Sequence, residues 1–257
     1  MGFKVENYIK TQEELADMRK AGKLLSSILS GLKGMIKPGL DVWELEKTFI
    51  SFCQKNQLSP ACKGYDPFGG WPFPTGLCVS INSQSVHCFP KKGVVLKDGD
   101  IVTVDTVVKY KNTHVDSAFA SAVGKVSPRT QKFLSTVESA LYNAIEEVAD
   151  GVRIGKLSSK LQKSVEKAGF NVLRDYAGHG IGYDMHEWPQ ILCYGNKNDG
   201  PKLKTGMTIC IEALCCSGNC KVENLNLWET KMKDNGLFAQ FEHTILVLDK
   251  GYEILTK

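Results

Sequence analysis

Two segments of the chain repeat one order of residues and end in a carboxylate. Residues 96–105 and 203–212 both read Leu-Lys-x-Gly, four further residues, a β-branched residue and an acid, which is Asp105 in one copy and Glu212 in the other. A carboxylate that ends an apolar strand is costly to bury unless a cation meets it. The repeat therefore predicts two acidic strand ends that share one cationic centre.

A second acid follows each copy of the repeat. Asp116 follows Asp105, and Glu242 follows Glu212 in the same way. If residues 110–111 form the centre of a hairpin turn, the two aspartates face each other directly across antiparallel strands, with Cβ atoms ~5 Å apart. A bound divalent cation would remove their repulsion, whereas the plainer alternative is a surface hairpin with two solvated aspartates.

Four carboxylates in equivalent places of two halves can converge across a twofold axis. Oxygen-rich ligation with some imidazole suits a pair of divalent ions such as Mn, Fe(II), Co or Zn. Two such ions ~3.5–4 Å apart can hold a bridging water. The sequence thus predicts a dinuclear metal centre.

All five histidines lie beside these motifs. His179 stands in a Gly-His-Gly-Ile-Gly segment that has no counterpart in the first half, and we expect it to be the additional metal ligand. His87 and His186 are related by the repeat, and we expect them to polarise a substrate carbonyl and hold a proton. His114 and His243 are expected to be buried structural histidines.

The elements that must position these groups also occur twice. Helical spacing of apolar residues predicts helices that begin at Thr11, at about Asp41, at Ser127 and near Leu157. Strands are expected at residues 78–82, 100–108, 115–123, 171–176, 207–214 and 241–248, and loops at 66–76 and 194–202. We therefore expect an α+β fold in one domain, residues 1–257, with pseudo-repeat halves at about 11–125 and 126–257 after a short segment 1–10.

Composition narrows the class of protein. The chain has 257 residues, 23% of them charged, and a net charge of +4. The sequence contains neither a run of roughly 20 apolar residues nor a secretory pattern, so we expect a cytoplasmic protein without membrane contact. No motif for sequence-specific nucleic-acid binding is present, and a monomer is expected.

Nine cysteines in such a chain are expected to be reduced thiols. Cys215, Cys216 and Cys220 lie close in sequence, but a structural zinc site would need a second matching group of ligands. We therefore expect no structural zinc site there.

The ordered set of metal-ligating residues resembles the dinuclear site of the methionine aminopeptidases, a family with the "pita-bread" fold. The resemblance runs from about residue 11 to 256 and is closest to the bacterial type I members. It rests on Ser-Ile-Asn at 80–82, Gly-Asp-Ile-Val at 99–102, Gly-His-Gly-Ile-Gly at 178–182, Gly-Met at 206–207 and Gln-Phe-Glu-His-Thr at 240–244. It implies that the metal ligands are Asp105, Asp116, His179, Glu212 and Glu242.

The resemblance also implies a reaction. It is removal of the initiator methionine from new polypeptides whose second residue is small, through attack of a metal-bridging water on the Met-Xaa carbonyl. Glu212 would move the proton, His186 would stabilise the tetrahedral intermediate, and His87 would contact the scissile amide. The partners implied are N-terminal Met-Xaa peptides, nascent chains and a ribosome near its exit tunnel.

A methionine pocket should be apolar and lined by sulfur or aromatic groups. Cys62, Tyr65, Cys78 and Trp228 fall where the family places this lining, and the alternative is that they are ordinary core residues. The loop at 66–76 is longer than usual in the family, and its residues Phe68, Trp71 and Phe73 are expected to reshape the pocket rim.

Two other functions remain open from the sequence. One is a proline-specific peptidase, although such relatives carry a large N-terminal domain and only ten residues precede Thr11. The other is an inactive pita-bread protein that binds nascent chains, ribosomes or RNA, which should have lost some of the ligands.

Overall fold

A large antiparallel sheet runs through the molecule. The computed structural model describes residues 5–67 and 69–257. Its strands are β1 (Ser59–Pro60), β2 (Cys78–Ile81), β3 (Ile101–Tyr110), β4 (Thr113–Ala122), β5 (Asn171–Val172), β6 (Ala177–Gly180), β7 (Glu187–Leu192), β8 (Thr208–Cys216), β11 (Phe238–Val247) and β12 (Tyr252–Ile254). They are ordered β1-β3-β4-β11-β8-β6-β7, with β2 on β3, β5 on β8 and β12 on β11. A separate hairpin pairs β9 (Val222–Asn224) with β10 (Thr230–Met232).

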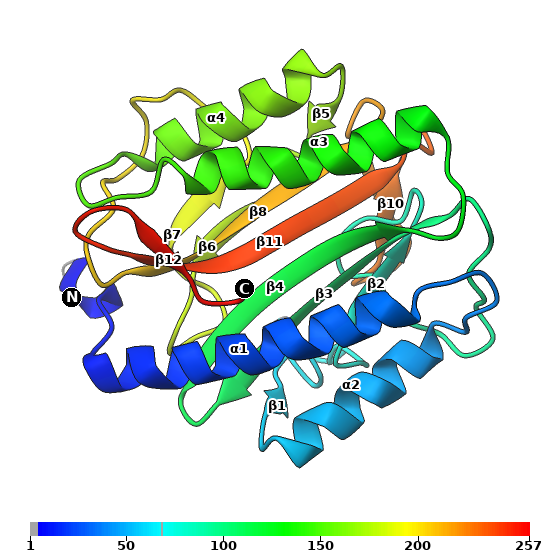
Figure 1. The fold of residues 1–257 in the computed structure, drawn as a ribbon, viewed down its shortest axis with the longest axis horizontal. Helices are drawn as coiled ribbons and strands as arrows, with labels where there is room; N and C mark the ends of the chain where they lie inside the picture. The colour runs from blue at the N-terminus through cyan, green and yellow to red at the C-terminus, as the bar shows by residue number, and fades with distance from the viewer. Residues whose placement is uncertain (1–4, 68) are drawn as a thin grey trace.

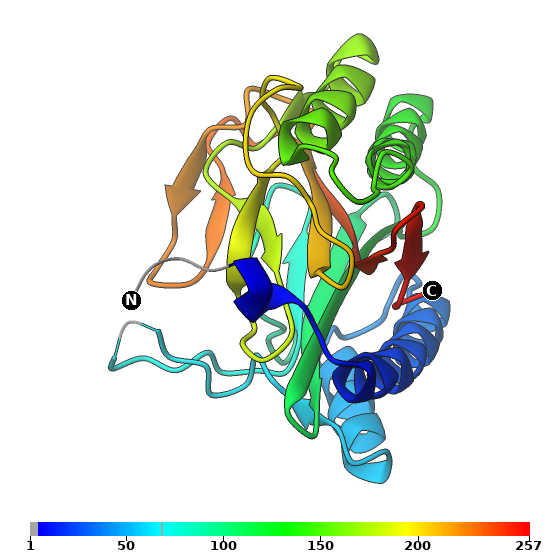
Figure 2. The ribbon, with the colours of Figure 1, turned by 90° about the vertical axis from the view of Figure 1, so that its left-hand side faces the viewer.

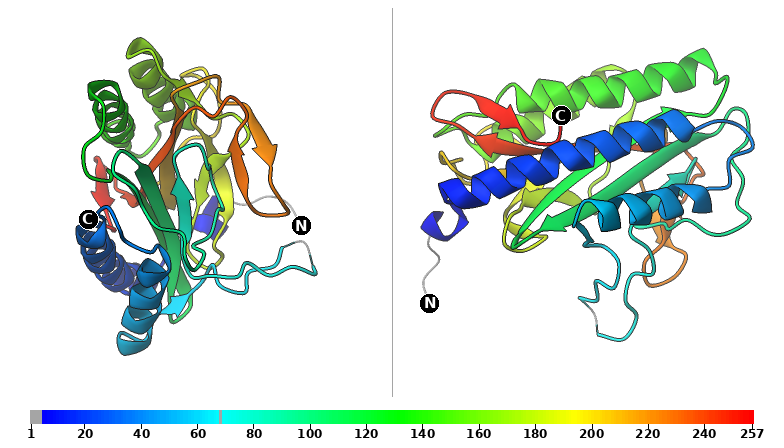
Figure 3. Two further views of the ribbon diagram at one scale, coloured as in Figure 1. Left: turned by 90° about the vertical axis from the view of Figure 1, so that its right-hand side faces the viewer. Right: turned by 60° about the horizontal axis from the view of Figure 1, so that its bottom comes forward.

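The helices cover one face of this sheet (Figure 1). They are α1 (Gln12–Met35), α2 (Trp43–Lys55), α3 (Pro128–Ile145) and α4 (Ile154–Lys167), preceded by a short 3-10 helix, η1 (Val5–Tyr8). Figure 3 shows that the loop before β2 and the β9–β10 hairpin extend from the opposite face. Among the described residues, no helix has both the length and the apolar character to cross a membrane.

Both long helices start where the sequence predicts. Thr11 forms a capping box with Glu14, whose backbone N–H donates to the Thr11 hydroxyl while its carboxylate accepts from the Thr11 N–H. Ser127 caps α3 by accepting from Thr130 N, and Pro128 occupies the first turn. Their apolar faces pack on the sheet, so each half has a helix-covered core.

The two halves share backbone hydrogen bonds at equivalent places. Gly39 follows α1 with φ +88°, and Gly151 follows α3 with φ +75°, a conformation that glycine adopts without strain. Gly39 N donates to Leu96 O at 2.8 Å, and Gly151 N donates to Leu203 O at 2.9 Å. The leucine of each Leu-Lys-x-Gly motif therefore accepts a hydrogen bond from the glycine that separates the two helices of its half.

The glycines of that motif are also equivalent. Gly99 has φ +91° and Gly206 has φ +89°. Gly99 N donates to Val123 O at 2.9 Å, and Gly206 N donates to Val247 O at 3.0 Å. The repeat in the sequence is thus a repeat in three dimensions. The central strand order β3-β4-β11-β8 is symmetric, because β3 corresponds to β8 and β4 corresponds to β11.

The register of the first hairpin differs from the expectation. Tyr110 pairs with Thr113, so the turn is centred on Lys111 and Asn112 rather than on residues 110–111. Lys111 takes a left-handed φ of +49°, which closes the turn one residue later. The prediction that Asp105 and Asp116 are directly opposed is therefore wrong.

Two other expectations about strands need correction. Only Asn171–Val172 of the predicted strand 171–176 is extended in the sheet. The chain then enters β6 and β7, which the sequence pattern does not predict because β6 contains two glycines and Pro189 interrupts β7.

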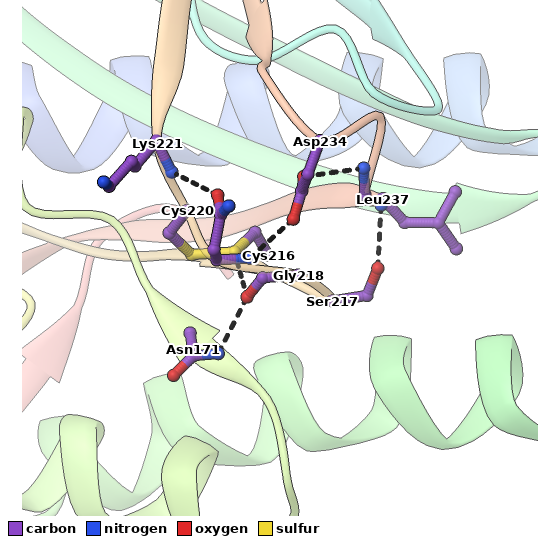
Figure 4. The surroundings of a disulfide bond; sticks show 10 residues. Asn171, Cys216, Ser217, Gly218, Cys220, Lys221, Asp234 and Leu237 are labelled. Atoms are coloured by element: carbon purple, nitrogen blue, oxygen red, sulfur yellow. Dashed lines mark hydrogen bonds between the residues drawn. A yellow bond between two sulfur atoms is a disulfide. The ribbon is translucent and has the colours of Figure 1, made fainter.

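The expectation that all cysteines are reduced is also wrong. Cys216 and Cys220 form a disulfide across the loop after β8 (Figure 4). Side chains hold this loop in place, because Asn171 Nδ2 donates to Gly218 O at 2.7 Å and Asn219 N donates to Asp234 Oδ2 at 2.7 Å. The other seven cysteines are free and buried.

Candidate active site

A cavity of about 370 Å³ lies on the sheet face opposite α1 and α3. Along β4, Asp116 faces this cavity while its neighbour Ser117 faces the groove between the two long helices. The cavity brings together every site residue that the sequence predicts. These are Asp105, Asp116, His179, Glu212, Glu242, His87, His186, Cys62, Tyr65, Cys78 and Trp228.

The four carboxylates come from the four central strands. Asp105 on β3 pairs with Ala118, and Asp116 on β4 pairs with Val107, so the two aspartates are diagonal neighbours on one face. Glu212 on β8 pairs directly with Glu242 on β11. Such neighbours on one face lie about 5–8 Å apart at Cβ, within reach of a shared ion.

His179 reaches this group from β6. Its Nε2 lies 3.5 Å from Glu212 Oε1 and 3.7 Å from Asp116 Oδ2. Its Nδ1 lies 2.9 Å from the carbonyl oxygen of Gly180, which fixes a proton on Nδ1 and leaves Nε2 free to accept or ligate. Ligand atoms of Asp116, His179 and Glu242 all lie within 4.8 Å of one another, together with the Cys210 sulfur.

Burial raises the pKa of every acid in this cluster. The pKa of Asp105 rises to about 6, chiefly because the carboxyl is removed from water. Burial, followed by repulsion from the neighbouring acids, also raises the pKa values of Asp116, Glu212 and Glu242 well above their ordinary range. Burial lowers the pKa of His179 to about 3, so this imidazole is neutral. A bound cation would reverse the effect on the acids, because it favours their charged forms.

Two carboxylate oxygens in the cluster fit a metal ion in particular. Asp116 Oδ1 and Glu242 Oε1 are buried and have no hydrogen-bond partner within residues 5–67 and 69–257. Leaving a buried charged acceptor unsatisfied is expensive, and such an atom requires an explanation. Four carboxylates and one neutral imidazole are a suitable donor set for divalent Mn, Fe, Co or Zn.

Two further histidines stand beside the cluster. The ring of His186 lies 4.5 Å from that of His179, and its Nδ1 lies 3.3 Å from the Tyr65 hydroxyl. His87 has φ +62°, an uncommon conformation for a residue with a side chain, and its ring packs edge-on against Tyr176 and Trp228. Burial lowers the pKa values of both histidines, that of His87 to about 4, so both are neutral near pH 7.

An apolar wall closes one side of the cavity. Phe73 packs edge-on against Trp228 with ring centroids 5.2 Å apart, and Trp228 Nε1 donates to the carbonyl oxygen of Trp71 at 2.9 Å. The Trp71 side chain itself is 47% exposed. The loop thus contacts the cavity wall through Phe73 and the backbone of Trp71. The expectation that its aromatic residues reshape the pocket rim stays a prediction, and Phe68 lies outside the described residues.

Some residues of the cavity were not predicted. Gln240 Nε2 donates to Glu242 Oε2 at 2.9 Å, and Cys210 adjoins the acids. Both lie two residues before an acid on the same strand, so strand alternation could have identified them. Tyr176 and Gln190 also line the cavity, but no motif in the sequence marks them.

The remaining two histidines form hydrogen bonds outside the cavity, and His114 is buried as expected, whereas His243 is only half-buried. His114 Nδ1 lies 3.0 Å from Gly182 O. His243 lies between the Tyr142 hydroxyl, 3.1 Å from Nε2, and the Thr256 hydroxyl, 2.9 Å from Nδ1. Neither residue lines the cavity.

Comparison with known proteins agrees with this arrangement. The model of metallopeptidase family M24 matches residues 16–249. The chain is 40% identical over 249 residues to methionine aminopeptidase 1 of Bacillus subtilis (strain 168), covering 96% of this chain and 98% of that protein. It is 41% identical over 251 residues to a methionine aminopeptidase of Mycoplasma capricolum, covering 97% and 98%.

Solved structures give the same result. The crystal structure of a methionine aminopeptidase from Thermotoga maritima matches with a TM-score of 0.92 and 38% identity, covering 97% of this chain and 98% of that one. The chain belongs to metallopeptidase family M24. The predicted α+β pita-bread fold is confirmed, with its sheet and four helices.

Proposed function

We propose that this protein is a metal-dependent aminopeptidase that removes methionine from the N-terminus of new polypeptides, mainly when the second residue is small. One observation carries the proposal: acids from both halves and the His179 imidazole meet in a single cavity, and two of the buried carboxylate oxygens have no hydrogen-bond partner among the described residues. Relatives named methionine aminopeptidases over nearly the whole chain favour this activity over a proline-specific peptidase or an inactive binding protein.

We propose that Asp105, Asp116, His179, Glu212 and Glu242 hold two divalent ions. Mn, Fe(II), Co and Zn all suit this donor set. When bound, the ions supply Lewis acidity and a water that is easily deprotonated. The protein contributes the positions of the ligands, and Gln240 orients Glu242 by donating to its carboxylate.

The residues around the ions would handle the proton and the carbonyl. Glu212 would accept the proton of the attacking water and pass it to the leaving amine. The Tyr65 hydroxyl lies 3.3 Å from His186 Nδ1 and would donate to it, which would leave a proton on Nε2 for the substrate. Neutral His186 would then donate this hydrogen bond to the carbonyl oxygen as negative charge develops there, while His87 contacts the scissile amide.

The apolar part of the cavity would take the methionine side chain. Cys62, Cys78, Tyr65 and Trp228 line it, and soft sulfur and aromatic groups suit a flexible thioether. A hydrogen bond with Cys62, followed by burial, raises the pKa of the Cys78 thiol well above its usual range, so this thiol is uncharged. An uncharged wall favours methionine over polar side chains.

We further propose that residues 1–257 act as one catalytic domain with pseudo-repeat halves, in the cytoplasm and as a monomer. The continuous sheet supports the first point. Nascent chains near the ribosomal exit tunnel would be the natural source of substrate.

The test uses the purified full chain and a Met-Gly-x peptide. We expect release of free methionine that a chelator abolishes and added Mn, Fe(II), Co or Zn restores. An N-acetylated version of the same peptide should remain intact. Cleavage of an Xaa-Pro peptide alone would favour the proline-specific alternative, and tight binding of RNA or peptide without turnover would favour the inactive one.

A further inference from the structure

A buried ammonium group lies behind the candidate active site, in the segment that precedes α1. Lys10 Nζ lies 2.6 Å from Glu187 Oε2, and the two side chains are 5% and 7% exposed. Of the ion pairs that lysine and arginine form within residues 5–67 and 69–257, only this one buries both side chains so deeply. A buried pair gives little net stability, because desolvation offsets most of the attraction, so its presence calls for another explanation.

The segment that carries Lys10 is attached at several points. Lys10 N donates to Gly206 O at 2.9 Å, and Ile9 forms a β-bridge with Met207. The Tyr8 ring packs on the Trp188 ring with centroids 5.3 Å apart. Figure 2 shows η1 lying against the β6–β7 hairpin. Residues 8–10 are therefore attached to this hairpin and the adjoining strand, and Lys10 is the most deeply buried of the three.

Lys10 contacts both ends of the loop that carries His186, residues 181–186. Glu187 Oε2 accepts a hydrogen bond from Lys10 Nζ, while Glu187 Oε1 accepts one from Asp184 N at 3.1 Å. A Cβ at Gly182 would overlap the Lys10 side chain, so the loop also packs directly on that side chain.

His186 lies between these fixed points. It directly precedes Glu187 in the chain, and its ring faces the cavity beside His179. Displacing the backbone at residue 187 would displace the imidazole. A shift of about 1 Å in a catalytic group can lower turnover by about 100-fold.

We propose that Lys10 is a positioning residue that holds the His186 imidazole in place through Glu187. The inference rests on the proposed aminopeptidase function, in which His186 acts on the carbonyl in the transition state. Lys10 does not line the cavity, so it should affect kcat rather than substrate binding.

The test is the steady-state kinetics of Lys10→Met in the metal-loaded full chain. We expect kcat to fall about 10- to 100-fold with KM changed by less than about threefold. Lys10→Arg, which keeps the charge, should recover part of the loss. The matched control is Arg19→Met, which breaks the exposed pair between Arg19 and Glu253 and should leave kcat unchanged.

A double-mutant cycle with His186→Ala separates positioning from general damage. If Lys10 acts through His186, adding Lys10→Met to His186→Ala should lower kcat by less than about twofold, because the two effects are not additive. Should Lys10→Met alone fail to fold, Lys10→Met/Glu187→Gln removes both charges and is expected to fold, with the same loss of kcat.

The outcomes are distinct from those for the proposed function. A wild-type protein that releases no methionine overturns the function itself. An active wild type with unchanged kcat in Lys10→Met, or an equal further loss in the His186→Ala background, overturns the role of Lys10 alone.

Discussion

The two halves of this molecule share a scaffold but differ at one decisive position. β2 lies on β3 as β6 lies on β8, with Ser80 opposite Thr103 in the first half and His179 opposite Cys210 in the second. The Ser80 hydroxyl donates to the carbonyl oxygen of Ser85, whereas His179 points toward the acids. The duplicated strands supply carboxylates in equal number, and a single imidazole makes the centre asymmetric.

The connections between the shared elements differ more than the strands do. The first half has the loop that supports Trp228, and the second half has strand β7, which directly follows His186. We therefore expect the repeated strands to hold the metal ions, and the segments that differ to position the groups that contact the substrate. This difference is testable, because substitutions in the repeated strands and in the segments that differ should change different properties: turnover in the first case and KM in the second.

The largest effects should come from the repeated acids. We expect Asp105→Asn and Glu212→Gln each to lower kcat/KM by more than about 100-fold, since even residues that only orient metal ligands are worth about 10- to 100-fold. Glu212→Gln should fall further, because this residue also moves the proton. Peptide turnover and metal content by mass spectrometry are the measurements, with Glu253→Gln on the helix side as control. Activity retained in Asp105→Asn would count strongly against the assignment.

The second comparison is between two histidines: His179, which is buried in the cavity, and His243, which is half-buried outside it. His179→Ala should remove nearly all turnover while the fold is retained. His243→Ala should keep turnover and lower the free energy of unfolding by about 1–2 kcal/mol, because two hydrogen bonds are lost. Circular dichroism during urea unfolding, alongside the peptide assay, distinguishes the two. Equal loss of activity in both variants would mean that the two histidines are not functionally different.

The stability effect of His243 should depend on pH. Burial lowers its folded-state pKa to about 4, below the unfolded value of about 6.5. The folded protein therefore binds this proton more weakly, so the contribution is complete above about pH 6.5 and is lost as pH falls toward about 4. The stability difference between wild type and His243→Ala should shrink over that range, and a difference that grows in acid contradicts the buried neutral imidazole.

A smaller effect is expected in the apolar wall. Trp228→Ala should raise KM for methionine peptides about tenfold with little change in kcat, because it removes packing around the side chain. Trp71→Ala should change KM by less than about threefold, since the group that accepts from Trp228 is the backbone carbonyl of residue 71. An unchanged KM in Trp228→Ala would place the methionine pocket elsewhere.

The smallest effect on turnover should come from the disulfide. It closes a loop with a sequence separation of 4, for which chain entropy predicts about 2 kcal/mol of stability. Cys216→Ser should lose that amount under oxidising conditions, show no difference from reduced wild type, and keep full turnover. Thiol titration of the unfolded, unreduced protein should find seven free cysteines; nine would mean that the bond does not form.

The sequence was most informative where it repeats itself. Asp105 and Glu212 could be identified because a duplicated motif places equal charges at equal strand ends, and alternation would have added Gln240 and Cys210. The hairpin register could not be predicted, because Lys111 takes a left-handed conformation that no glycine or asparagine marks at that position. The contact between Lys10 and Glu187 could not be predicted either, because the two residues are 177 positions apart in the sequence.

The most direct test of convergent acids is a crystal structure grown with Mn(II), with the ions located by anomalous scattering. The account predicts ions between Asp105, Asp116, Glu212 and Glu242, with His179 bound to one of them. Ions held by the carboxylates of one half alone, or bound outside this cavity, would contradict it.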